Sequence, residues 1–77
     1  MEGKSSEIIR NLCKRKNIKI SDLAEKLNMS SQNLSNKLRR DNFPESELHD
    51  IAVALNCKYI QYFEDKDGKI YKIIRED

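Results

Sequence analysis

The chain has 77 residues, of which 38% are hydrophobic and 36% are charged, and its formal net charge is +2. This length is typical of one domain and leaves no room for a separate ligand-sensing domain beside a hydrophobic core. No apolar run approaches the roughly 20 residues that span a bilayer, and the first residues lack the apolar segment of a secretory signal, so we expect a soluble, cytoplasmic protein with no membrane partner.

Charge and chemically reactive residues are distributed unevenly. Residues 1–43 carry ten Lys/Arg and five Asp/Glu, whereas residues 44–77 carry five and eight. A basic first part suits a polyanionic partner, although an ordinary solvated surface also carries such charge. Cys13, Cys57 and His49 are too dispersed for a metal site, so we expect reduced thiols, no metal and no cofactor.

Two helices are predicted in the first part of the chain. The first spans residues 5–16, can be capped by the serine at position 5 or 6, and can end at Asn17. The second spans residues 20–27 and can end at Asn28, because asparagine tolerates the left-handed backbone conformation that stops a helix. The apolar faces of the two helices are formed by Ile8, Ile9, Leu12 and Cys13, and by Leu23, Ala24 and Leu27.

A third helix over residues 31–39 follows a short turn, with Ser30 as a good N-cap. Only Leu34 and Leu38 are apolar in it, so the helix is polar and basic around most of its circumference. Pro44 opens a fourth helix, in which Leu48, Ile51, Ala52 and Leu55 have the spacing of an amphipathic helix, and Asn56 can end it.

Beyond Asn56 the pattern changes from helix to strand. Residues 59–63 and 70–74 are rich in β-branched and aromatic side chains, and they flank Asp67-Gly68, a strong hairpin turn signal. The predicted fold class is therefore mainly α, with four helices and a C-terminal β-hairpin. We assign residues 1–57 to the helical part and residues 58–77 to a hairpin extension of the same domain.

The segment from Lys19 to Arg40 is the most informative about function. Two short helices are joined by a tight turn, the small Ala24 faces their crossing point, and the polar third helix suits the major groove of DNA. Over about residues 8–55, the chain resembles the lambda-repressor-like (Cro or XRE type) helix-turn-helix transcriptional regulators. The residues that carry this resemblance lie within 20–30, 32–38 and 43–55.

The resemblance implies a fold of the lambda-repressor type. It also implies a transcriptional repressor that binds a two-fold-symmetric site in double-stranded DNA as a homodimer. It implies base contacts from Ser31, Gln32 and Asn36. It implies contacts to the DNA backbone from Lys19, Ser21, Ser30, Asn33, Lys37, Arg40 and Asn42. Alternatives remain open for several of these residues: the amides can form an ordinary solvated face, Lys37 can be a solvent lysine, and Arg40 can interact with the helix dipole.

The sequence also departs from the family pattern. Asn28 stands where many members have glycine, and Ile20 stands where a polar phosphate contact is common. Many members pair an arginine in the first helix with a glutamate late in the third. The matching positions here are Cys13 and Leu38, so we expect packing in place of that ion pair.

A two-residue turn at Asp67-Gly68 would pair Phe63 with Lys72 and leave both hairpin faces apolar. We therefore expect one face to cover the first or fourth helix, and the other face or the open edge to form a dimer. The residues expected to mediate dimerisation are Tyr59, Phe63, Ile70 and Ile74.

Other functions were compared with DNA binding. A protein partner bound through the hairpin, as in an antitoxin that also represses its own operon, is the principal alternative. An enzyme is not indicated, because the sequence shows neither paired carboxylates in a plausible cleft nor a Cys–His pair nor a phosphate loop. RNA binding is not indicated either, because the sequence lacks the exposed aromatic platform expected for it.

Overall fold

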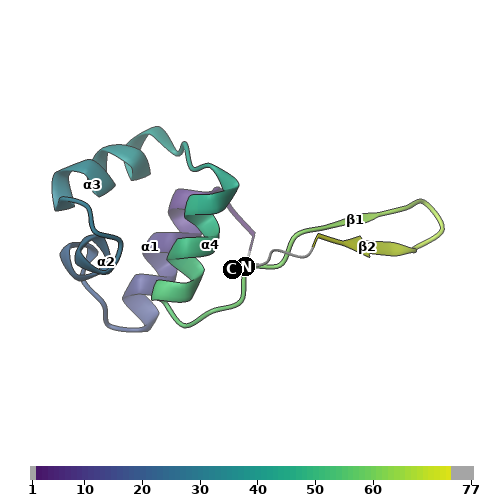
Figure 1. Cartoon of the computed structure of the whole chain (residues 1–77), viewed down its shortest axis with the longest axis horizontal. Coiled ribbons are helices and arrows are strands. Elements are labelled where there is room, and N and C mark those ends of the chain that lie inside the picture. Colours follow the sequence, from purple (N-terminus) through teal and green to yellow (C-terminus); the bar gives the residue numbers. More distant parts are fainter. Residues whose placement is uncertain (1, 74–77) are drawn as a thin grey trace.

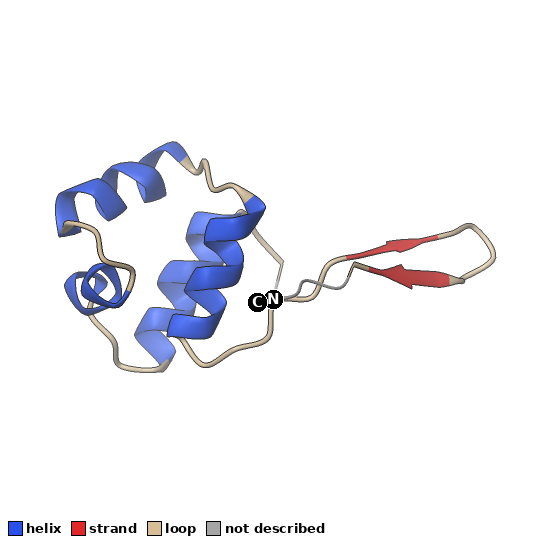
Figure 2. Cartoon of the chain, viewed as in Figure 1, coloured by secondary structure: helices blue, strands red, loops and turns tan. Residues whose placement is uncertain are grey.

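The computed structural model describes residues 2–73, which form four helices followed by a two-stranded antiparallel hairpin (Figures 1 and 2). This architecture confirms the predicted fold class, and each helix begins and ends within two residues of its predicted bounds. The elements are α1 (Ser5–Arg15), α2 (Ile20–Lys26), α3 (Ser31–Arg40), α4 (Glu45–Ala54), β1 (Tyr62–Glu64) and β2 (Ile70–Lys72).

Left-handed residues end the helices, as the sequence predicted for three of them. Asn17, Asn28 and Asn56 have φ values of 57°, 58° and 57°, a conformation that few residue types other than glycine and asparagine adopt without cost. Asp41 ends α3 with a φ of 53°. The chain therefore reverses at short polar side chains, and each turn can be tight without glycine.

Asp41 also caps a helix that is distant in sequence. Lys4 occupies the N-cap of α1 and makes no side-chain capping bond, so the predicted cap at Ser5 or Ser6 is wrong. Instead, the Ser6 backbone N–H donates to Asp41 Oδ1 at 2.8 Å. This hydrogen bond lowers the pKa of the Asp41 carboxyl from its ordinary value. The loop after α3 is thereby attached to the start of α1.

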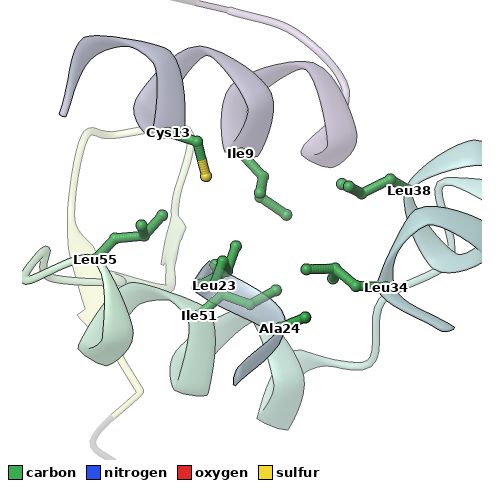
Figure 3. Close-up of a cluster of buried hydrophobic side chains, with 8 residues drawn as sticks. All are labelled: Ile9, Cys13, Leu23, Ala24, Leu34, Leu38, Ile51 and Leu55. Atoms are coloured by element: carbon green, nitrogen blue, oxygen red, sulfur yellow. The ribbon is translucent and has the colours of Figure 1, made fainter. Parts of the chain in front are cut away.

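A single apolar core lies between the four helices (Figure 3). Leu34 and Leu38 extend from α3 into this core, where they are 0% and 2% exposed. The expectation that Cys13 and Leu38 pack in apolar surroundings is confirmed. The buried residues that form this core cluster are Ile9, Cys13, Leu23, Ala24, Leu34, Leu38, Ile51 and Leu55.

The hairpin pairs in a different register from the predicted one. Phe63 lies opposite Tyr71 and Tyr62 opposite Lys72, so the predicted pairing of Phe63 with Lys72 is wrong by one residue. The cause is a three-residue loop: the Asp65 N–H donates to the Lys69 carbonyl at 2.8 Å. Gly68 has a φ of 86°, as expected for a type I turn completed by a left-handed residue.

The hairpin projects away from the helices and does not cover them (Figure 1). Every residue of both strands is exposed, so the prediction that one face packs on α1 or α4 is wrong. When the Gln61 amide is turned so that its nitrogen faces α4, it donates to both carboxylate oxygens of Glu45 at 2.8 Å. In this orientation the amide connects the base of the hairpin to α4. Because the hairpin projects from the helices, the molecule is elongated, with principal extents of 43 × 27 × 22 Å.

Candidate nucleic-acid interface

The helix α3 has one buried side and a broad polar side. Leu34 and Leu38 are the side chains that fix it in the core, and Ser30 at its N-cap accepts a hydrogen bond from the Asn33 N–H at 3.1 Å. The cap and the two leucines together determine the position and rotation of the helix. The exposed residues of α3 are Ser31, Gln32, Asn33, Ser35, Arg39 and Arg40.

The three predicted base-contact residues lie at the start of α3 and one turn later. Ser31 and Gln32 are exposed in the first turn, and Asn36 is half-buried four residues after Gln32. Residues four apart lie on the same side of a helix, so Gln32 and Asn36 form one short ridge of amide groups. Amide side chains can donate and accept at once, as recognition of adenine in the major groove requires.

Sequence analysis did not assign a DNA-binding role to Arg39. It lies seven residues after Gln32, which is close to two helical turns, so it continues the same ridge at its C-terminal end. Arg39 is exposed, and its guanidinium group can bind a phosphate or a guanine edge. Counting helical turns from Gln32 along the sequence would have identified it.

A polar hollow lies beside this ridge and collects four of the residues predicted to contact the DNA backbone, together with Asn36. Side chains from α3 and from the loop after it surround this hollow, so residues up to nine positions apart in sequence face one space. The lining residues are Asn33, Asn36, Lys37, Arg40 and Asn42. Amides and cations without a carboxylate among them suit an anionic group such as a phosphate oxygen.

Lys37 differs from the other lining residues because it has a partner within the protein. Its Nζ lies 2.6 and 2.7 Å from the two carboxylate oxygens of Glu47 on α4. Both side chains are less than one third exposed, at 31% and 23%. The sequence suggested a phosphate contact or a solvent lysine, and the structure adds a third role, an ion pair that joins α3 to α4. No local sequence pattern indicates this pair, since Glu47 resembles an ordinary acidic residue in the first turn of a helix.

The remaining predicted backbone contacts lie around the start of α2 and at its junction with α3. Lys19 and Ser21 are exposed at the N-terminal end of α2, and Ser30 is exposed at the cap of α3. The Asp22 carboxylate accepts a hydrogen bond from the Lys19 N–H at 3.2 Å and stabilises this end of the helix. Ile20 is half-buried against the core, so at this position packing takes the place of the polar side chain that is common in the family.

Other kinds of site were examined across residues 2–73. In this part of the chain no cluster of three or more His, Cys, Asp or Glu side chains could hold a metal ion, and no helix is long and apolar enough to cross a membrane. Cys13 and Cys57 are free thiols, and burial raises the pKa of Cys13, which disfavours its reactive thiolate form.

A model of a known protein family matches most of the chain. The family model of the Cro/C1-type helix-turn-helix DNA-binding domain matches residues 9–64. This range includes most of α1, all of α2, α3 and α4, and the first strand of the hairpin. No curated protein and no solved structure matches the chain.

Proposed function

Because the chain belongs to the Cro/C1-type helix-turn-helix DNA-binding domain family, we propose that it is a transcriptional repressor that recognises a specific DNA sequence through α3. The observation that carries this proposal is the two-sided character of α3. Leu34 and Leu38 are fully buried, whereas the opposite side presents amide and guanidinium groups. An α-helix fits the major groove, where those groups can distinguish base pairs.

In this proposal the ridge and the hollow have different roles. Ser31, Gln32 and Asn36 contact base edges and determine which sequence is preferred. Groups around the hollow and at the start of α2 contact phosphates, which fixes the orientation of the helix in the groove but carries no sequence information. The proposed phosphate contacts are Lys19, Ser21, Ser30, Asn33, Arg40 and Asn42, with Lys37 available only when it leaves Glu47.

We further propose that two copies bind one operator as a homodimer. An operator with two-fold symmetry then contains two half-sites, each bound by one α3, about one helical turn or about 10 base pairs apart. The exposed hairpin supports this assembly, since Phe63 is 68% and Ile70 49% exposed. These two residues lie on opposite faces in the observed register, and Ile74 lies outside the described residues.

Selection of bound duplexes from a random DNA pool tests the proposal. We expect an enriched, two-fold-symmetric motif, whose half-site separation reports the distance between the two α3 helices. Enrichment of an asymmetric motif would support sequence-specific DNA recognition but contradict binding as a symmetric dimer. Binding without any sequence enrichment would contradict specific recognition by α3.

The exposed hairpin also favours a second candidate function, an antitoxin-like protein that binds an unrelated partner through the hairpin and represses its own operon. The hairpin is far from α3, so both activities could occur in one molecule (Figure 1). Purification of the chain with its genomic neighbours coexpressed discriminates the two. A stable complex that depends on the hairpin residues would favour the antitoxin.

A further inference from the structure

We propose that the hairpin of each copy inserts into the groove between α1 and α4 of a second copy, so that two chains exchange hairpins reciprocally. This inference rests on the homodimer in the proposed function and specifies which surfaces form it. Two features carry the proposal: an apolar arm whose strands leave the helices, with Ile73 at its base next to Glu45 and His49 of α4, and an apolar groove on those same helices.

The first feature is the hairpin face that contains Phe63, Tyr71 and Ile73. In the observed register Phe63 lies directly opposite Tyr71, and Ile73 follows on the same face because alternate residues point to the same side. Their exposed fractions are 68%, 48% and 44%. The other face carries a charged residue in each of its two strand pairs, because Tyr62 lies opposite Lys72 and Glu64 lies opposite Ile70. A two-stranded hairpin is marginal in water unless a face of this kind is covered.

The second feature is a groove of about 210 Å³ along α1 and α4. Ile8 and Leu12 line it from α1, Leu48 and Ala52 from α4, and Tyr59 closes one end at the base of the hairpin. Ile8 is half-buried and is not among the residues packed against the core, so its side chain belongs to the groove. Tyr59 was predicted to mediate dimerisation from the hairpin, but it lines this groove in its own chain.

The apolar face of the arm is shorter than the groove and fits within its length. Phe63 and Tyr71 lie opposite each other, and Ile73 comes two residues after Tyr71 on the same face. The apolar face therefore extends about 7 Å along the strand. From Leu48 to Leu55 the groove follows α4 for about 10 Å. Because the chain's own hairpin points away from the helices, a second copy is the occupant that supplies this face without rearrangement (Figure 1).

The exposed area of the chain supports a second copy as the partner. A compact folded protein of 9.1 kDa exposes about 4,900 Å², whereas this chain exposes 6247 Å². The excess exceeds the approximately 800 Å² that each partner buries in a typical stable interface. Reciprocal exchange uses the arm and the groove of each chain once, so the same contact forms twice, the assembly closes on itself, and the product is a dimer instead of a fibre.

Two variants of the full chain, studied without DNA, test the exchange. Phe63→Glu places a charge on the arm, and Ile8→Glu places one in the groove; both positions lie outside the core, so the helices remain folded. By sedimentation, we expect each variant alone to raise the Kd of dimerisation about tenfold or more. The matched controls are Tyr62→Glu on the opposite hairpin face and Val53→Glu on the exposed side of α4, and both should dimerise like the unmodified chain.

Mixing the two variants provides the decisive measurement. In a mixed pair the intact arm of the Ile8→Glu chain meets the intact groove of the Phe63→Glu chain, so one of the two contacts is restored. We expect mixed dimers at concentrations where each variant alone is monomeric. Absence of mixed dimers, normal dimerisation of Ile8→Glu, or an unmodified chain that stays monomeric would each overturn the exchange.

Binding to a DNA duplex with one half-site separates this inference from the proposed function. The exchange variants alter neither α2 nor α3, so their affinity for a single half-site should equal that of the unmodified chain. Loss of dimerisation with normal half-site binding supports the exchange and leaves DNA recognition intact. If the unmodified chain dimerises but binds no specific half-site, the exchange holds and the proposed function fails.

Discussion

Gln32 offers the most direct test of base recognition at the scale of one residue. It is exposed in the first turn of α3, and a glutamine amide can form two hydrogen bonds with adenine in the major groove. We expect Gln32→Ala to weaken operator binding by about 1–3 kcal/mol per half-site and to relax the preference at one position. Competition binding with single-base variants of the operator measures this. Val53→Ala, on an exposed part of α4, is the control, and an unchanged base preference in Gln32→Ala would contradict the assignment.

Arg40 and Glu47 should change the salt dependence of DNA binding in opposite directions. Arg40 lines the polar hollow, so Arg40→Ala should flatten the slope of log K against log salt by about one unit. Glu47 holds the Lys37 ammonium at 2.6 Å, so Glu47→Gln should free Lys37 for a phosphate and increase affinity and slope. Titrations at several salt concentrations measure both effects. An altered base preference in Arg40→Ala, with a normal slope, would show that Arg40 contacts bases.

Asp41 should make stability depend on pH in the acidic range. The Ser6 N–H lowers the pKa of its carboxyl below the ordinary value of 3.8, so the folded chain favours the charged form. This contribution is full above the pKa of the unfolded chain and is lost as pH falls through the lower pKa of the folded chain. We expect Asp41→Asn, which tolerates the left-handed φ of 53°, to lower Tm at neutral pH. The Tm difference should narrow as pH falls below 3.8, and a difference that is constant with pH would contradict this account.

At the scale of elements, local signals in the sequence predicted the helices well. Ser30 caps α3 as expected, and Asn17, Asn28 and Asn56 end their helices as predicted. These features depend on a few neighbouring residues, which a sequence displays directly. The amide ridge of α3 was predictable for the same reason, because helical spacing alone places its residues on one side.

Contacts between distant elements were not predictable in this way. The cap of α1 comes from Asp41, 35 residues beyond Ser6, and the partner of Lys37 lies on a different helix. The prediction of the hairpin register was wrong for another reason: Asp-Gly suits both a two-residue turn and the longer loop that is observed. A one-residue difference in loop length moves the side chains of a strand to the opposite face of the hairpin. It therefore places Phe63 and Ile70, which were both expected to mediate dimerisation, on opposite faces.

The conformation of Gly68 should control the stability of the hairpin. Its φ is 86°, and a Cβ at this position would meet no atom within 4 Å, so substitution costs energy only through the backbone. We expect Gly68→Ala to destabilise the turn by about 1–2 kcal/mol, and Gly68→Asn to do so less. Hydrogen exchange of the Asp65 N–H, which donates to the Lys69 carbonyl, reports the opening of the turn. Equal exchange in both variants would contradict a requirement for the left-handed conformation.

At the scale of the whole molecule, the helices should fold without the hairpin. All buried residues belong to α1, α2 and α3 or lie in or next to α4, and strand residues are exposed. We expect a chain that ends at Tyr59 to keep its helical circular dichroism, to be monomeric, and to bind one half-site normally. Its affinity for the full operator should fall, because the second half-site is no longer bound by a linked α3. A truncated chain that is folded and still dimeric would exclude the hairpin from the interface.

The length of the molecule separates two properties that are combined in many compact proteins. The helices α2 and α3 lie at one end of the longest axis and the hairpin at the other (Figure 1). The residues that we propose to contact bases share no position with those that we propose to pair the chains, so each set can change by mutation without disturbing the other. A gene duplicate altered only at Ser31, Gln32 and Asn36 would still pair with its parent. Such a mixed pair would bind an operator whose two halves differ, and one small domain could thus serve a family of control sites.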